Sequence, residues 1–163
     1  MYSCSIFRSS FNKVFSNSDS TIEFPILFFN VFISVALVEE CAKWIVTKYV
    51  GYKNSNFDEI YDIIVYSVFA SLVFACLENV LYVFQNDVIN AIVRSITFIP
   101  RHASFGIAMG YFFAKARVNE MNNNKSGKSK NMVLSLIVPT LLHTIYDAIL
   151  MGELSIVYFL LFI

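Results

Sequence analysis

Ionisable side chains interrupt long apolar stretches at four places in this sequence. The first group, Glu39, Glu40 and Lys43, lies within an apolar run of residues 24–50. A charged side chain near the centre of a membrane helix costs roughly 2.5 to 3.5 kcal/mol on insertion scales, so three of them require a compensating function. We interpret that function as chemistry carried out inside the bilayer.

The other three groups follow in chain order, one in each later apolar run. They consist of charged or amide side chains: Glu78 and Asn79; Arg94, Arg101 and His102; His143 and Asp147. Counted at about 1.5 Å per residue from the nearest predicted loop, all four groups fall near the middle of a hydrocarbon core about 30 Å thick. The sequence therefore predicts one shared site at mid-bilayer depth.

The spacing inside two of these groups places possible partners on one helix face. Lys43 follows Glu39 by four residues and Glu40 by three. His143 precedes Asp147 by four residues. Side chains three or four residues apart are neighbours on a helix surface. We therefore expect Lys43 to pair with a carboxylate, and Asp147 to fix the orientation or tautomer of the His143 imidazole.

The third apolar run carries two backbone signals. Pro100 lacks a backbone N–H just before His102, which predicts a broken helix that lines a cavity. Gly106 and Gly110 form a Gly-x-x-x-Gly face, which lets another helix approach closely. Both signals favour a site enclosed between closely packed helices.

Hydrolysis by an activated water is the reaction that this residue set favours. Because Glu39 and Glu40 are adjacent and repel each other, one is suited to hold a proton while Lys43 keeps the other ionised. One glutamate would act as general base toward water. His102 or His143 would polarise the substrate carbonyl or stabilise the oxyanion. Asn79 offers a further donor.

Several other hydrolase classes fit this sequence less well, because their motifs are missing. The sequence has no His-Glu-x-x-His zinc motif, no Gly-x-Ser-x-Gly serine motif and no Gly-x-Gly-Asp aspartyl motif. A metal bound by His102, His143 and a glutamate is compatible with the ligand types alone. Two non-proteolytic alternatives are a small transporter or proton path and a non-catalytic membrane-binding subunit. A transporter would be expected to show inverted repeats, and the four groups differ from one another.

The elements that must position these residues are membrane helices. The chain has 163 residues, 57% hydrophobic and 15% charged, and a formal net charge of +0. A soluble domain of this length cannot bury so much apolar surface, and without a basic excess we expect no nucleic-acid partner. Three scattered cysteines without a Cys-x-x-Cys pair indicate neither a disulfide framework nor a thiolate metal site.

The predicted fold class is all-α, a polytopic helix bundle with about four spanning helices. The runs that reach the required length of about 20 apolar residues are residues 24–50, 60–84, 88–116 and 132–151. Loops are predicted at 51–57, 85–87 and 118–131. The apolar piece after Gly152 is too short to span, so it is either part of a fifth helix or a surface segment.

Basic residues predict the orientation of the helices. They gather around the third loop: Lys115, Arg117, Lys125, Lys128 and Lys130. By the positive-inside rule this loop, and the first loop with it, faces the cytoplasm, and the amino terminus lies outside. Residues 1–23 are predicted to be either an interfacial amphipathic helix or a disordered tail.

The four motifs also occur in a specific order. They are Glu39-Glu40-x-x-Lys43, Phe74-Ala75-x-x-Glu78-Asn79, Arg94 with Pro100-x-His102-x-x-x-Gly106 and Gly110, and His143-x-x-Tyr146-Asp147. This order resembles the PrsW family of intramembrane proteases, which is related to the CAAX prenyl-protease and bacteriocin-processing superfamily. The resemblance covers residues 31–151.

The resemblance implies a multi-pass peptidase of the bacterial plasma membrane. It would hydrolyse a peptide bond in or near the spanning part of a membrane-anchored protein, an anti-sigma factor in the founding case. Glu39, Glu40 and one of the histidines, His102 or His143, would be the catalytic set. The supporting residues would be Lys43, Glu78, Asn79, Arg94 and Asp147.

The resemblance leaves the catalytic type open. The wider superfamily includes both glutamic-type and metal-dependent assignments, so the cofactor is either none or a divalent metal such as zinc. Residues 24–163 would form a single membrane-embedded protease-like domain after the segment 1–23. Because relatives commonly carry additional spanning helices, we expect a compact or fragmentary member of the family.

Overall fold

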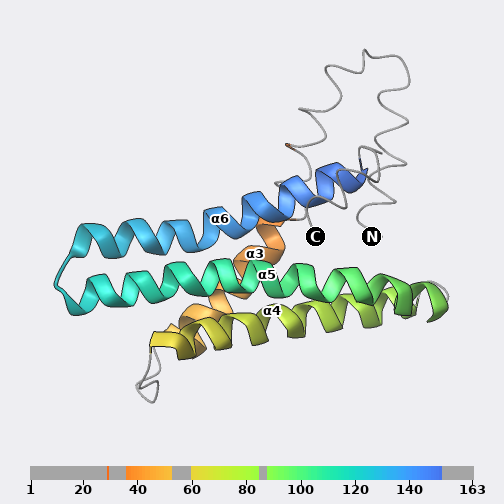
Figure 1. Cartoon of the computed structure of the whole chain (residues 1–163), viewed down its shortest axis with the longest axis horizontal. Helices are drawn as coiled ribbons and strands as arrows, with labels where there is room; N and C mark the ends of the chain where they lie inside the picture. Colours follow the sequence, from red (N-terminus) through yellow and green to blue (C-terminus); the bar gives the residue numbers. More distant parts are fainter. Residues whose placement is uncertain (1–28, 30–35, 53–59, 85–87, 152–163) are drawn as a thin grey trace, which may run out of the picture. The chain divides into compact units, whose positions relative to one another are not determined.

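The described part of the chain is helical. A computed structural model describes residues 29, 36–52, 60–84 and 88–151, and no strand occurs among them. The elements are α3 (Leu37–Val46), the π-helix η2 (Thr47–Tyr52), α4 (Ile60–Val83), α5 (Val88–Met121) and α6 (Lys125–Met151), as Figure 1 shows. The predicted all-α class is confirmed for these residues. One compact unit is Glu39–Thr140, and α6 from Leu141 onward belongs to a second unit, as do Leu37 and Val38 at the start of α3.

Among the described residues, α4 contains the one segment that is long and apolar enough to cross a membrane. This segment is Tyr61–Leu81, with a mean hydropathy of 2.0. Large apolar side chains recur every four residues on its exposed face: Tyr61, Val65, Phe69, Val73, Leu77 and Leu81. A helix with apolar side chains on its exposed face as well as on its packed face is typical of a membrane span, so α4 is suited to lipid contact.

The apolar core of the larger unit forms around Phe113 of α5. Its ring lies 5.8 Å from that of Trp44 and 5.7 Å from that of Tyr52, between ring centroids. Trp44 also donates a hydrogen bond from Nε1 to Ser135 Oγ at 2.8 Å, which connects α3 with α6. Indole N–H groups usually find a partner when they are buried. This core therefore holds α3 and η2 against α5 and the first part of α6.

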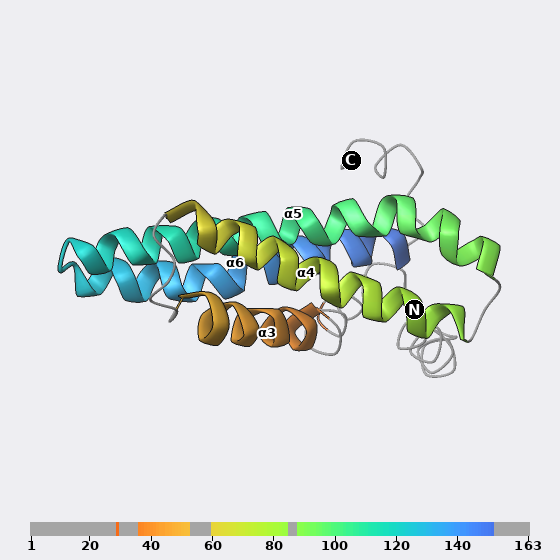
Figure 2. The same cartoon turned by 90° about the horizontal axis from the view of Figure 1, so that it is seen from below.

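Helices α4 and α5 run side by side, and two glycines allow them to approach closely (Figures 1 and 2). A Cβ atom added to Gly110 would lie 2.6 Å from Ile64 Cα, and one added to Gly106 would lie 2.9 Å from Val68 Cα. These neighbours are backbone atoms, which cannot turn aside as a flexible side chain can. The close approach predicted from the Gly-x-x-x-Gly face is confirmed.

Replacing Gly110 by valine is expected to destabilise the protein by at least about 1–3 kcal/mol, because the new side chain forces α4 and α5 apart. The measurement is the thermal unfolding midpoint in detergent. Ser104→Val is the matched control, since it places the same β-branched side chain at an exposed position of α5. Equal midpoints for the two variants would contradict this packing.

The predicted long loop at 118–131 was wrong. Helix α5 continues to Met121 and α6 begins at Lys125, so only residues 122–124 connect them. Asn123 has a φ of 55°, and Asn124 N–H donates to Asn119 O at 2.8 Å, as in a Schellman C-cap. The Asn124 side chain then accepts from Gly127 N–H at 2.9 Å and caps the start of α6. Consecutive asparagines therefore end one helix and begin the next.

Two smaller predictions were also wrong. Helix α5 is continuous through Pro100, because a single proline removes one backbone hydrogen bond without ending a long packed helix. The first loop does not begin at Gly51, since η2 continues to Tyr52, whose side chain is buried against Phe113. The predictions for residues 1–23, 53–57, 85–87 and 152–163 lie outside the described residues.

Candidate functional site

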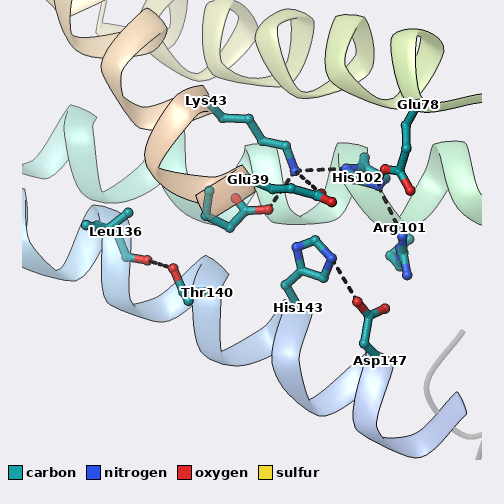
Figure 3. Close-up of polar contacts among 10 residues, drawn as sticks. Glu39, Lys43, Glu78, Arg101, His102, Leu136, Thr140, His143 and Asp147 are labelled. Carbon is teal, nitrogen blue, oxygen red and sulfur yellow. Dashed lines mark hydrogen bonds and ion pairs between the residues drawn. The ribbon is translucent and has the colours of Figure 1, made fainter. Parts of the chain in front are cut away.

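A buried polar cluster lies where α3 meets α5 in the larger unit (Figure 3). Lys43 Nζ lies 2.6 Å from Glu40 Oε1 and 2.9 Å from His102 Nδ1. All three side chains are fully buried. Glu39, one helical turn from Lys43, has its Oε2 3.9 Å from the same ammonium and is 26% exposed. The predicted pairing of Lys43 with a carboxylate is confirmed, and the shorter contact is to Glu40.

The other side of the His102 ring faces α4 and the neighbouring arginine. Its Nε2 lies 3.1 Å from Arg101 Nη2 and 3.8 Å from Glu78 Oε2. The Phe98 ring packs on the imidazole with 4.4 Å between centroids, and the Arg101 guanidinium lies 4.3 Å from the same phenyl ring. The imidazole is thus held by an aromatic contact while both ring nitrogens face polar groups.

The proton count of His102 limits these contacts. Lysine and arginine side chains donate hydrogen bonds and, when charged, accept none, while a neutral imidazole has one accepting nitrogen. Lys43 at Nδ1 and Arg101 at Nε2 therefore cannot both donate to the neutral ring at once. A small displacement of Lys43 or Arg101 would decide which ring nitrogen of His102 accepts a hydrogen bond. The imidazole is therefore suited to exchanging hydrogen-bond partners during a reaction.

Three ligand-type atoms come together at the same place. One oxygen each from Glu39 and Glu78 and one ring nitrogen of His102 all lie within 4.8 Å of one another. Two carboxylates and an imidazole are suitable zinc ligands, and catalytic zinc sites commonly have three protein ligands. Residue types and spacing therefore fit a divalent metal, provided that Arg101 withdraws from His102 Nε2.

The family resemblance implied a supporting role for Glu78, and the structure places its carboxylate 3.8 Å from His102 Nε2. Asn79 follows on α4, and its Oδ1 is buried with no hydrogen-bond partner among the described residues. Arg94 lies within α5, but its side chain is outside the described residues. Its supporting role stays a prediction.

His143 and Asp147 belong to the second unit, where they contact each other. His143 is 1% exposed, and its Nε2 lies 3.2 Å from Asp147 Oδ2 (Figure 3). The predicted orientation of this imidazole by Asp147 agrees with this contact. The meeting of His143 with the cluster of the larger unit, and the metal set that included His143, stay predictions.

Sequence reasoning assigned no role to the hydroxyls of Ser67 and Ser71. Both are fully buried on α4 and have no hydrogen-bond partner among the described residues. They lie four residues apart, and Glu78 follows Ser71 by seven, so the three share one helix face. That polar stripe within an apolar run was the signal from which the site-facing side of α4 could have been predicted.

Fold and site together define a class of protein. An apolar α-helix with lipid-type character packs beside a helix whose buried imidazole contacts a lysine and glutamates. Ionisable groups enclosed in this way are typical of helical membrane proteins that carry out chemistry or transport within the bilayer.

Comparison with known proteins identifies the family. A family model described as PrsW family intramembrane metalloprotease matches residues 3–163. Proteins named Protease PrsW from Oceanobacillus iheyensis and Bacillus subtilis are each 40% identical, over 133 and 134 residues, and each match covers 82% of this chain and 60% of the relative. The relative from Clostridioides difficile is 36% identical over 126 residues, covering 75% of the chain and 52% of the relative.

The chain belongs to the PrsW family of intramembrane proteases. Membership places it in a bacterial membrane. The chain spans about 60% of the length of the first two of these relatives. No solved structure matches it.

Proposed function

We propose that this chain is an intramembrane endopeptidase that hydrolyses a peptide bond in or near the spanning part of a membrane-anchored protein. The observation that supports this most directly is that carboxylate oxygens from two helices and a nitrogen of one buried imidazole on a third all lie within 4.8 Å of one another. By family resemblance, the substrate is a single-pass regulatory protein of the anti-sigma type.

The proposal includes a multi-pass arrangement in the plasma membrane. The exposed apolar face of α4 supports lipid contact for that helix, and α5 and α6, with 34 and 27 residues, have the length that a spanning helix needs. Residues 24–163 would form one membrane-embedded domain, and residues 1–23 a separate segment. The cytoplasmic side would be the side of the turn at 122–124, where the basic residues gather.

The two adjacent glutamates are proposed to have different roles. Glu40 is fully buried and lies 2.6 Å from Lys43, so it serves as the counter-charge that holds the ammonium beside His102. Glu39 is partly exposed, so a water or a substrate can reach its carboxylate. Glu39 is therefore proposed as the general base toward water.

His102 and Arg101 are proposed to stabilise the negative charge that develops on the scissile carbonyl oxygen. Both carry N–H donors, and Glu78 lies close enough to orient the imidazole. His143, oriented by Asp147 in the second unit, is the further candidate for this role. Asn79 would supply an additional hydrogen bond.

Two routes of water activation use the same residues. In the metal-free route Glu39 removes the proton from water directly. In the metal-dependent route Glu39, Glu78 and His102 would hold a divalent ion such as zinc, which when bound makes a coordinated water more acidic. Glu78→Gln separates the routes: cleavage that falls and recovers with added zinc indicates a metal ligand, and cleavage that falls without recovery indicates the metal-free route, in which Glu78 only orients the imidazole.

The test of the proposed function is cleavage in a reconstituted membrane. Purified protein in vesicles with single-pass substrate peptides is expected to release fragments whose mass places the cut in or near the spanning segment. His102→Ala is expected to slow cleavage about 10²-fold, which is typical for loss of one donor to an oxyanion. Equal cleavage by the variant at equal protein level would refute the assignment of this site.

A further inference from the structure

A second polar site lies away from the cluster around His102. It is a pocket of about 640 Å³ between η2, the end of α5 and the start of α6, lined by Lys48, Tyr52, Arg117, Glu120, Lys128 and Met132, among others. Arg117 lies about 22 Å along α5 from His102 at the rise of an α-helix. We propose that this pocket binds the phosphate group of an anionic phospholipid.

The lining of the pocket has an excess of positive charge. Three cationic side chains, Lys48, Arg117 and Lys128, face one carboxylate, that of Glu120, which leaves a net charge of +2. Lys48 lies over the Trp44 ring at 4.3 Å from its centroid, and it contacts no carboxylate among the described residues. An anion that enters the pocket would therefore meet positive charge that the protein does not neutralise.

Glu120 holds the cations in place rather than cancelling them. Its carboxylate lies 2.5 Å from Lys128 Nζ and 3.5 Å from Arg117 Nη1, and it accepts a hydrogen bond from Tyr52 OH at 2.5 Å. A lysine and an arginine carry more donors than these contacts use. The remaining N–H groups are available to phosphate oxygens, and the side chains that carry them are already ordered.

The ionisation states of this network agree with that role. Hydrogen bonds from Lys128 and then Tyr52 hold the pKa of the Glu120 carboxyl below its ordinary value. Burial and the bond to Glu120 raise the pKa of the Tyr52 phenol. At neutral pH Glu120 is thus ionised and Tyr52 keeps the proton that it donates.

The surroundings of the pocket match the interface between headgroups and acyl chains. Trp44 and the exposed Tyr49 lie beside Lys48, and aromatic residues of this kind are enriched at membrane interfaces. Met132 and the 56% exposed Val133 supply an apolar edge next to the charges. A phospholipid has this same pairing of an anionic group with an apolar chain, and anionic lipids are concentrated in the cytoplasmic leaflet.

The test compares lipid binding by two charge-matched double variants of the whole chain. The pocket variant is Arg117→Gln with Lys128→Gln. The control is Lys125→Gln with Lys130→Gln, which removes two exposed lysines from the first two turns of α6. Native mass spectrometry in neutral detergent measures bound phosphatidylglycerol against phosphatidylcholine. We expect the pocket variant to bind phosphatidylglycerol at least tenfold more weakly, and the control to change less than twofold. Lys48 makes no contact with Glu120, and the Lys48→Gln variant should bind phosphatidylglycerol about fivefold more weakly.

Three results would overturn the proposal. Equal losses in the two double variants would mean that the attraction is spread over all basic residues. Inorganic phosphate that displaces phosphatidylglycerol at equal concentration would assign the pocket to soluble phosphate. Binding of an acidic peptide that requires Arg117 and Lys128, with lipid binding unaffected by their loss, would assign it to a protein partner.

Discussion

Glutamine in place of Glu39 is expected to lower the rate of peptide-bond cleavage by about 10²- to 10⁴-fold, the range that general acid–base catalysis contributes. The amide keeps the size and shape of the side chain but cannot take a proton from water. Glu39 is partly exposed and makes only the longer of the two carboxylate contacts to Lys43, so folding should be little affected. The measurement is the single-turnover cleavage rate of a reconstituted single-pass substrate.

The matched control for this variant is Asp62→Asn, which also removes one carboxylate charge but lies in the first turn of α4, away from the cluster. It should cleave within a few-fold of the unmodified protein. Glu39→Asp should retain part of the activity, because it keeps the base but moves it. A Glu39→Gln protein that cleaves as fast as the control would remove Glu39 as the base and direct attention to Glu40.

The helices themselves could be predicted because their signal is local. Long apolar runs predicted α4 and the start of α5 within one residue of the observed ends. The pairing of Lys43 with a carboxylate followed from the helical repeat, and the close approach at Gly110 followed from the Gly-x-x-x-Gly spacing. The two contacts depend on residues three or four positions apart, and the helices on uninterrupted apolar stretches of the chain.

Features that depend on long-range contacts or on capping geometry could not be predicted in the same way. The Tyr52 and Glu120 pair joins residues 68 positions apart, and nothing in either local sequence indicates the other. The turn at 122–124 was interpreted as a loop because it is polar, whereas its asparagines act as helix caps. Composition indicates solvent exposure, but it does not indicate whether a polar stretch is helical.

The partner of His102 is the most consequential of these long-range features. Depth counting placed Glu39, Glu78 and His102 at a similar level but could not say which carboxylate faces the ring. The structure places Lys43 on one ring nitrogen and Arg101 on the other, with Glu78 nearby. A cation held this close to an imidazole in an apolar setting requires its own counter-charge, which Glu40 supplies.

Methionine in place of Lys43 is therefore expected to be the most destabilising single change in the cluster, by about 3–5 kcal/mol. Methionine fills a similar volume, but the change leaves the fully buried Glu40 carboxylate without the ammonium that lies 2.6 Å away. Thermal unfolding in detergent measures the effect. Lys125→Met is the control, because it removes the same charge from an exposed position and should stay within about 0.5 kcal/mol of the unmodified protein.

A second substitution separates loss of charge pairing from loss of packing. The double variant Glu40→Gln with Lys43→Met removes both charges, so it should be more stable than Lys43→Met alone even though it carries one more change. Recovery of this kind is possible only if the cost of the single variant is an uncompensated buried charge. A double variant that is less stable than Lys43→Met would mean instead that Glu40 is held by contacts independent of Lys43, and the role of Glu40 as the counter-charge that positions Lys43 against His102 would have to be abandoned.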